Sequence, residues 1–247
     1  MGSKRKFIAL DIETAKIVPG ESFNWQAHRP LGITCIATFT GDGQPRAWYS
    51  TGEDGVPSAQ MSRDDVREVV LYLNHELDQG ALPLSWNGLA FDFDILAEES
   101  DMWGECRQLA HQHVDMMYHV VCQMGHPVAL KNAAKGMNLA GKLAGVEGID
   151  APALWKAGQF DTVLKYVAQD VRVTLAVAEE AERRKRFEWL TTAGKIKSMP
   201  LPDGWLSVAD AERLPLPDTS WMSQPLKRER FTAWLRSKSR EQHVSQS

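Results

Sequence analysis

The sequence has few of the features that mark disulfide-stapled and membrane proteins. Its 247 residues include three cysteines, Cys35, Cys106 and Cys122, without CxxC or CxxH spacing. An odd number of cysteines in this arrangement favours neither a disulfide framework nor a structural zinc site, so we expect a reducing, cytoplasmic location. No stretch approaches the roughly 20 apolar residues of a membrane span. The apolar run near the N-terminus stops at Asp11, which is too early for a signal-peptide core.

The chain also lacks a net positive charge. The formal net charge is −4, which argues against a protein that coats nucleic acid by bulk positive charge, because phosphate neutralisation requires clustered Lys and Arg. The charge is unevenly distributed: residues 1–181 contain 15 Lys and Arg against 24 Asp and Glu, a net of −9, whereas residues 182–240 contain 13 against 7, a net of +6. An acidic body therefore precedes a basic C-terminal segment.

The order of apolar runs and helical periodicities predicts an α/β fold. Runs rich in apolar and β-branched residues predict strands over residues 7–12, 33–39, 46–50 and 82–86, with a short one near 114–116. Helical spacing predicts helices from Ser62 to Gly80, from about Phe91 onward, and from Asp161 to about Phe187, with Asp161 as the cap of the last. The turn between the second and third strands is short enough for an antiparallel hairpin. We therefore expect a mixed β-sheet with helices on both faces.

The composition changes near residue 190. Five prolines and three tryptophans, Trp205, Trp221 and Trp234, lie between residues 191 and 236. We predict a domain over residues 4–190 and an irregular extension over 191–236, which is packed by its tryptophans and ends in a short helix over 226–235. A disordered polar tail is expected over 237–247.

The end of the first predicted strand carries two carboxylates. In Asp11-Ile12-Glu13-Thr14 the side chains alternate between the faces of the strand, so Asp11 and Glu13 project together. Their repulsion and desolvation would be costly without a cation between them, so the pair suggests a hard metal ion such as Mg²⁺ or Mn²⁺. A solvated strand end that happens to be acidic is the alternative.

Two further carboxylates lie on predicted helices. Asp92 falls in a first helical turn, where the helix dipole favours a carboxylate, so a capping role is the alternative to a functional one. Asp94 lies about 200° further round that helix, so the two cannot face one site. Tyr166 and Asp170 are four residues apart and share one face of the longest helix. Asp170 is close to the apolar stripe, where a charge requires a partner, whereas Tyr166 alone fits a core-edge aromatic.

Together these segments resemble the DEDD superfamily of 3′-to-5′ exonucleases, whose members share the ribonuclease H-like fold. The three motifs are matched in order by Asp11-x-Glu13, Asn87-x-x-x-Phe91-Asp92 and Tyr166-x-x-x-Asp170. The Tyr-x-x-x-Asp form resembles the tyrosine-bearing (DEDDy) branch, which includes family-B DNA polymerase proofreading domains and RNase D. Within it, the sequence looks like stand-alone bacterial and phage relatives of the proofreading domain. The resemblance covers about residues 4–187 and leaves out the basic extension.

The resemblance implies a role for each matched residue. Asp11, Glu13 and Asp170 would hold the cation that activates the attacking water. Asp11 would bridge to a second cation, whose site Asp92 would complete. The two ions, Mg²⁺ or Mn²⁺, would stabilise the attacking and leaving oxygens at phosphorus. Tyr166 would orient the water and could assist its deprotonation, although a phenol with a pKa near 10 is a poor base at neutral pH.

Three residues of these motifs are candidates for contact with the terminal nucleotide. Asn87 and Phe91 match the second motif and could shape the nucleotide pocket. The alternatives are a turn residue for Asn87 and a core aromatic for Phe91. Thr14 directly follows the first motif and could contact the nucleotide through its backbone.

Weaker candidates are aromatic or basic residues outside the motifs. Bases could stack on Phe23, Trp25 and His28, although Trp25 also suits packing. Three lysines at helical spacing could contact the phosphates of the substrate backbone: Lys131, Lys135 and Lys142. Such a pattern more often marks a solvated helix face. Two groups are discounted: His111 and His113, whose spacing does not align on a helix, and the cluster 183–186, which suits a solvated helix end.

We therefore predict a metal-dependent 3′-to-5′ exonuclease. It would hydrolyse phosphodiester bonds at the 3′ end of single-stranded nucleic acid, DNA in preference to RNA, and release nucleoside 5′-monophosphates. An RNase D-like exoribonuclease is the nearest alternative, because it shares all four carboxylates. A nucleic-acid or protein-binding module on the same fold is the alternative from another class, with the C-terminal extension as a surface for a protein partner.

Overall fold

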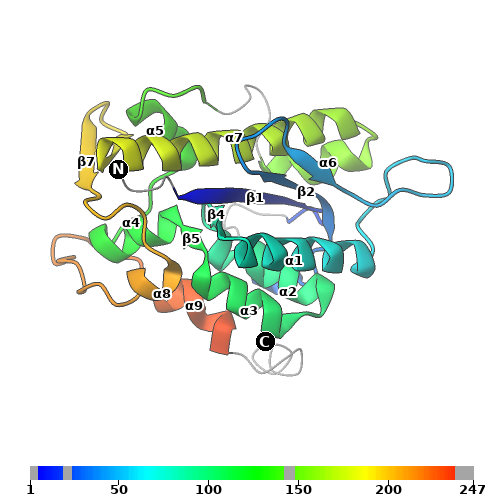
Figure 1. The fold of residues 1–247 in the computed structure, drawn as a ribbon, viewed down its shortest axis with the longest axis horizontal. Coiled ribbons are helices and arrows are strands. Elements are labelled where there is room, and N and C mark those ends of the chain that lie inside the picture. Colours follow the sequence, from blue (N-terminus) through cyan, green and yellow to red (C-terminus); the bar gives the residue numbers. More distant parts are fainter. Residues whose placement is uncertain (1–4, 19–23, 142–147, 237–247) are drawn as a thin grey trace.

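A mixed five-stranded β-sheet lies at the centre of this computed structural model, which describes residues 5–18, 24–141 and 148–236 (Figure 1). Its strands are β1 (Lys6–Thr14), β2 (Ile33–Phe39), β3 (Arg46–Trp48), β4 (Ala81–Ser85) and β5 (Val114–Asp115). They lie in the order β3-β2-β1-β4-β5. β2 is antiparallel to β1 and β3, whereas β1, β4 and β5 are parallel. The carboxyl ends of β1 and β4 therefore meet at one edge, where sites of α/β proteins form.

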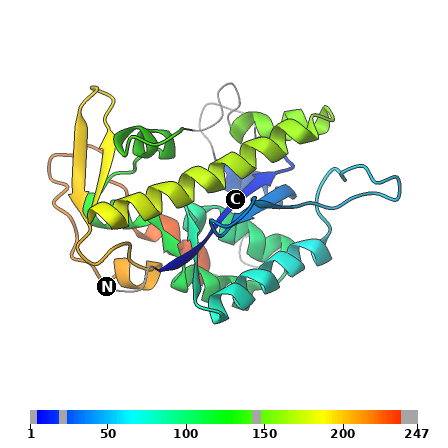
Figure 2. The ribbon, with the colours of Figure 1, turned by 45° about the horizontal axis from the view of Figure 1, so that its top comes forward.

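Helices cover both faces of the sheet (Figures 1 and 2). One face is covered by α1 (Arg63–Asp78), α2 (Asp92–Ser100) and α3 (Trp103–Gln112), and α7 (Phe160–Arg184) runs across the other. Ile8, Leu10 and Ile12 of β1 pack with the first group, whereas Phe7 and Ala9 pack with α7. The odd-numbered side chains of β1 therefore face α7.

Within the described residues, three further α-helices lie between β5 and α7 along the chain. They are α4 (Met116–Met124), α5 (Leu130–Gly136) and α6 (Ala151–Lys156), with 3₁₀ turns η1 (Trp25–His28), η2 (Gly88–Ala90) and η3 (Gly148–Asp150). None of the helices in the described part of the chain combines the length and apolar character needed to cross a membrane. The three cysteines are buried and free.

The predicted α/β architecture is confirmed, with one error at a helix start. The β2–β3 hairpin is antiparallel as expected, and the Ser62 side chain caps α1. Asp161 does not cap α7, because the helix already begins at Phe160, whose ring packs 4.9 Å from that of Trp155. Gln159 occupies the cap position, and Asp161 lies exposed in the first turn.

A β-hairpin opens the C-terminal segment, which the sequence led us to expect as irregular. Its antiparallel strands are β6 (Arg186–Leu190) and β7 (Ile196–Pro200), so the predicted boundary at residue 190 falls between them. The strands escaped prediction because β7 buries one residue, Met199, and so lacks a hydrophobic alternation. After α8 (Val208–Ala211), α9 (Glu229–Thr232) and η4 (Ala233–Arg236) form the expected terminal helix. The predicted disordered tail, 237–247, lies outside the described residues.

Two of the three tryptophans of this segment pack it against the domain. Trp205 is fully buried, and its indole N–H donates to the carbonyl of Ala178 on α7 at 3.2 Å. Trp234 donates to the Leu89 carbonyl in η2 at 2.6 Å. The prediction of packing is wrong for Trp221, which is 69% exposed. Its loop is held instead by Arg228, whose guanidinium donates to four backbone carbonyls.

We expect Trp205→Ala to lower the free energy of unfolding by about 3–5 kcal/mol, because it removes a fully buried indole and leaves a cavity. Trp221→Ala is the matched control and should change it by less than about 0.5 kcal/mol, because that ring is mostly exposed. Urea denaturation followed by circular dichroism measures both values. Equal losses in the two variants would contradict these packing roles.

Candidate active site

The end of β1 places two carboxylates on the face covered by α7. Asp11 and Glu13 are odd-numbered residues of this strand, and they pair across to Ala37 and Cys35 of β2. Glu13 is 6% exposed. The register between β1 and β2 shifts directly after Glu13, where the pairing becomes irregular. The predicted common orientation of the two carboxylates is thus present in the structure.

A tightly held turn brings the third carboxylate, Asp92, beside them. After β4 the chain turns through Asn87, which adopts a left-handed conformation with φ of 74°. The Asp115 carboxylate accepts the backbone N–H groups of Asn87 at 3.0 Å and Leu89 at 2.9 Å. Asp92 then opens α2, and its Oδ1 accepts the backbone N–H of Ile12 on β1 at 3.1 Å. The second motif is therefore fastened directly to the strand that carries the first.

Burial raises the pKa of Asp92 to about 7. The largest cause is loss of hydration, and the nearby charge of Asp115 adds to it, whereas the hydrogen bond from Ile12 opposes it. The pKa of Asp115 is itself raised by burial. A carboxyl group in this setting favours its neutral form unless a cation approaches.

Asp94 faces away from this site, as its position round the helix predicts. Its carboxylate forms an ion pair with the guanidinium of Arg29, which also donates to Glu98 Oε2 at 3.0 Å. The same guanidinium lies over the Trp25 ring, 4.7 Å from its centroid. Trp25 is buried and meets Phe91 edge to face, so the packing alternative for Trp25 is correct.

The long helix α7 supplies Tyr166 and Asp170. Both are buried, at 2% and 4% exposure, on the side of the helix that faces the pocket. Burial raises the pKa of Tyr166 above its usual value, and the charges of Asp170 and Glu13 add to the shift. The phenol therefore keeps its proton at neutral pH. Its hydroxyl lies close to Gly148: a Cβ added to that glycine would be 3.6 Å from the hydroxyl oxygen.

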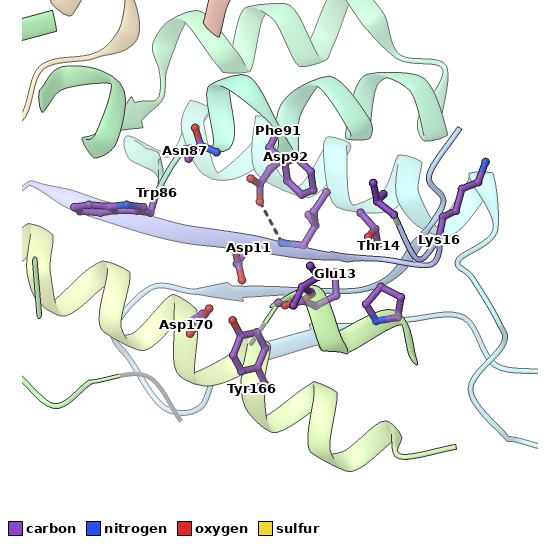
Figure 3. Close-up of a pocket in the computed structure, with 15 residues that line it drawn as sticks. Asp11, Glu13, Thr14, Lys16, Trp86, Asn87, Phe91, Asp92, Tyr166 and Asp170 are labelled. Atoms are coloured by element: carbon purple, nitrogen blue, oxygen red, sulfur yellow. Dashed lines mark hydrogen bonds between the residues drawn. The ribbon is translucent and has the colours of Figure 1, made fainter. Parts of the chain in front are cut away.

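These residues line one cavity of about 490 Å³ (Figure 3). The structure brings together eight predicted site residues: Asp11, Glu13, Thr14, Asn87, Phe91, Asp92, Tyr166 and Asp170. The figure shows Trp86 at one end of the cavity and Lys16 at the other. Further lining residues are Ile12, Val18, Gly148, Ile149 and Pro152.

Other residues that line this cavity were not predicted as site residues: Trp86, Lys16 and residues of the segment 148–152. Trp86 directly precedes the second motif and Lys16 follows the first by two residues, so proximity to the motifs was the available signal. The segment 148–152 carries no such signal, because it reaches the cavity through the packing of α6. The indole N–H of Trp155 on that helix donates to the Ser58 carbonyl at 2.9 Å.

The chemistry of the cavity fits a hard divalent cation. Carboxylate oxygens are the ligands that Mg²⁺ and Mn²⁺ prefer, and four such groups from three elements share this space. A cation would favour the ionised forms that burial disfavours. Among residues 5–18, 24–141 and 148–236, no three His, Cys, Asp or Glu side chains are already arranged to hold one ion. The assignment of metal ligands therefore rests on donor chemistry and remains a proposal.

The weaker candidates that fall within the described residues do not line this cavity. Lys131 and Lys135 are exposed on α5, and His28 is half-buried in η1. Phe23 and Lys142 lie outside the described residues. His113 is fully buried, where loss of hydration lowers its pKa to about 3, and it contacts Ser85 Oγ at 3.2 Å.

The arginines at the end of α7 have structural partners. Arg183 and Arg184 both donate to Glu180 at 2.7 Å, and Arg184 also reaches Glu188 at 2.9 Å. Arg184 donates as well to the Met137 carbonyl at 2.9 Å, so it joins α7 to the end of α5 and to β6. This fits a helix-end role better than a phosphate site.

The raised pKa of Asp92 predicts a pH-dependent stability in the presence of EDTA. A carboxyl group with a higher pKa in the folded than in the unfolded state binds its proton more tightly when folded, so the free energy of unfolding falls between pH of about 4 and 7. We expect Asp92→Asn to be more stable than the wild type at pH 8, by on the order of 4 kcal/mol, and similar to it at pH 4. Urea denaturation at several pH values measures this.

Asp161→Asn is the control for that comparison, because Asp161 is exposed. Its stability should follow the wild type at every pH. The same pH slope in Asp92→Asn as in the wild type would show that Asp92 is not the group responsible. Some slope is expected to remain, because burial also raises the pKa of Asp115.

Comparisons with known proteins support the fold. No curated protein matches the chain. Among solved structures, the family B DNA polymerase from the hyperthermophilic archaeon Pyrobaculum calidifontis is similar, with a TM-score of 0.53 and 20% identity over 72% of this chain and 25% of the polymerase chain. The chain thus spans about a quarter of that polymerase, and the likeness concerns the fold. Residues 47–182, more than half of the 247, match the family model described as the RNase_H superfamily. The chain therefore belongs to the RNase_H superfamily.

Proposed function

We propose that the protein is a metal-dependent 3′-to-5′ exonuclease of the tyrosine-bearing DEDD type, acting on single-stranded nucleic acid. The observation that carries the proposal is the convergence of Asp11, Glu13, Asp92 and Asp170 with Tyr166 in one cavity. These residues come from three elements far apart in the sequence, and they match three motifs in the order of that branch. Membership of the RNase_H superfamily supports a nuclease-type fold.

The four carboxylates would hold two divalent cations, Mg²⁺ or Mn²⁺. When bound, the cations supply an activated water and stabilise charge at the attacking and leaving oxygens. Asp11, Glu13 and Asp170 would bind one of them, and Asp11 with Asp92 the other. The hydrogen bond from Ile12 to Asp92 orients that carboxylate relative to β1, so the two halves of the ligand set are held by one strand.

Tyr166 would orient the attacking water rather than remove its proton. Burial and three neighbouring carboxylates raise the pKa of this phenol, so it remains a hydrogen-bond donor at neutral pH. Even without this shift, a phenol with a pKa near 10 is mostly protonated at neutral pH and is a poor base. The assistance in deprotonation that the sequence left open is therefore not part of the proposed mechanism.

The shape of the cavity supports binding of a single terminal nucleotide. Its volume of about 490 Å³ lies in the range of small-molecule sites. Phe91, Ile149 and Val18 give it apolar walls suited to a base, whereas Thr14 and Asn87 offer polar groups beside them. The expected product is a nucleoside 5′-monophosphate.

We expect Asp170→Ala or Asp11→Ala to lower phosphodiester hydrolysis by more than about 100-fold. Loss of a residue that only supports a metal ligand already lowers activity by up to about 100-fold, and these variants lose a proposed ligand itself. The physical reason is loss of a ligand oxygen from the cation site. Release of mononucleotides from a labelled single strand in Mg²⁺ measures this. The matched control is Asp161→Ala, an exposed carboxylate on the same helix, which should keep wild-type activity. Full activity in Asp170→Ala with an intact circular dichroism spectrum would refute the metal assignment.

Tyr166→Phe should lower kcat about 10- to 100-fold through misplacement of the water, with Mn²⁺ affinity unchanged. Steady-state kinetics gives kcat, and titration calorimetry gives the Mn²⁺ affinity. Tyr118→Phe is the control, because Tyr118 is a fully buried phenol on α4 that does not line the cavity. An unchanged kcat in Tyr166→Phe would exclude the water-orienting role.

One assay distinguishes the proposed exonuclease from an RNase D-like exoribonuclease and from a binding module on the same fold. Matched single-stranded DNA and RNA oligonucleotides, each incubated with Mg²⁺, Mn²⁺ or EDTA, should show release from the 3′ end with either metal and none in EDTA. Faster digestion of DNA supports the proposed substrate, and faster digestion of RNA supports the RNase D-like alternative. Binding of both without hydrolysis under any condition would favour a binding module.

A further inference from the structure

An exposed tryptophan stands out in the C-terminal segment. Trp221 is 69% exposed, although the other two tryptophans of the segment are buried. A large aromatic side chain left in water contributes little to the fold, and such residues are enriched where proteins bind partners. The exposed ring of Trp221 is therefore available for contact with a binding partner or substrate.

The loop that carries Trp221 is attached firmly to the end of α4. The backbone at Gly125 lies so close to the loop that an added Cβ would be 2.3 Å from the Thr219 methyl carbon. The Leu226 N–H donates to the Gly125 carbonyl at 3.2 Å. The guanidinium of Arg228 bridges the carbonyls of Cys122 and Pro215, both at 2.8 Å. The tryptophan is therefore presented from a fixed backbone.

The residues directly after Gly125 lead to the wall of the cavity. The His126 ring lies 6.4 Å from Trp221, in an edge-to-face arrangement. Two residues further on, the Val128 carbonyl accepts the indole N–H of Trp86 at 3.1 Å. Trp86 lies at the end of the cavity away from Lys16 (Figure 3). One short segment of chain thus joins the exposed indole to the candidate active site.

A series of rings limits the distance between the two indoles. Trp86, Phe187, Trp189, His126 and Trp221 follow one another in four steps of 6.4 Å or less, so Trp86 and Trp221 lie within about 26 Å. A stacked nucleic-acid strand advances about 3.4 Å per nucleotide, and an extended one more. A straight span of 26 Å corresponds to about eight stacked nucleotides, so a 12-nucleotide strand with its 3′ end in the cavity is long enough to reach Trp221.

Stacking is the contact that this surface can offer to a strand. Bases stack on aromatic side chains regardless of sequence, which suits an enzyme that must accept every nucleotide in turn. The arginines beside the loop and the end of α7 are engaged: Arg228 binds four carbonyls, and Arg184 binds Glu180 and Glu188. The net charge of +6 over residues 182–240 still has the sign that tolerates a polyanion nearby.

We propose that Trp221 is a stacking site for bases of the single-stranded substrate that lie 5′ of the active-site cavity. This rests on the proposed function, since it assigns the same strand to both sites. It makes the C-terminal segment part of the substrate path and predicts that Trp221 affects long substrates and not short ones.

The test compares Trp221→Ala with the wild type on a 12-nucleotide and a 3-nucleotide single-stranded DNA. For the 12-mer in Mg²⁺, KM should rise about fivefold or more, the effect of one lost stacking contact, with kcat unchanged. For the 3-mer, both constants should match the wild type. Trp221→Phe should restore most of the loss, because it retains a ring.

A binding measurement separates this inference from the proposed activity. Fluorescence anisotropy of a labelled 12-mer in EDTA should show weaker binding to Trp221→Ala than to the wild type. Leu216→Ala is the matched control: Leu216 is 81% exposed in the same loop but has no ring, and its loss should leave the affinity unchanged.

The outcomes are distinct. Unchanged KM and affinity for the 12-mer in Trp221→Ala, or an equal loss on the 3-mer, would overturn the inference while leaving the exonuclease proposal intact. An equal loss in Leu216→Ala would also overturn it, because it would indicate a general apolar contact instead of stacking. If Trp221 supports binding of the 12-mer but the wild type releases no nucleotides, the inference holds and the proposed activity fails.

Discussion

Burial of several carboxylates in one cavity is the constraint on which the rest of the site depends. Glu13, Asp92 and Asp170 are each 6% exposed or less. Loss of hydration and mutual repulsion disfavour their charged forms, and the effect reaches their neighbours. The pKa of Tyr166 is raised by burial and then by the charge of Asp170, and the pKa of Cys35 is raised by burial and then by Glu13. Tyr166 and Cys35 thus keep their protons at neutral pH. A divalent cation would offset the repulsion between the buried carboxylates.

A further buried carboxylate, Asp115, positions the backbone beside the site. Asp115 does not line the cavity; it accepts backbone N–H groups from Asn87, Leu89 and Tyr118 at 2.9–3.0 Å. The bonds from Asn87 and Leu89 hold a left-handed residue and the 3₁₀ turn after it, and this turn determines where Asp92 begins its helix. Asp115 therefore acts on the backbone that positions the site. The charge of Asp115 also raises the cost of ionising Asp92.

The features that could be predicted from the sequence are those decided within one element. Alternation along β1 orients Asp11 and Glu13, and helical spacing orients Tyr166 and Asp170, because each rule needs only neighbours in the chain. The orientation of Asp94 followed from the same geometry. Asp11, Glu13, Tyr166 and Asp170 also belong to the motifs on which the family resemblance is based.

What could not be predicted depends on contacts between distant segments. The partner of Asp94, Arg29, is 65 residues away, and the Ser58 carbonyl that holds Trp155 is 97 residues away. Asp115 ends a two-residue strand and belongs to no motif, so nothing local indicates its three backbone bonds. The β6–β7 hairpin buries too little on β7 to show a period of two. In each case the missing information is which surfaces meet.

Contacts between distant segments also attach the C-terminal segment to the elements around the site. Its Trp234 donates to the Leu89 carbonyl in the turn whose other side Asp115 holds, so the turn before Asp92 is fastened from both the domain and the extension. Its Trp205 backbone N–H donates to Glu182 on α7 at 3.1 Å, and Glu182 also pairs with Arg5 just before β1. The segment beyond the family match thus supports the turn before α2 and the helix α7, which are two of the three elements that carry the site. Within that segment, the guanidinium groups of Arg184 and Arg228 are committed to such bonds. Stacking on an exposed ring would hold a strand without these two cations.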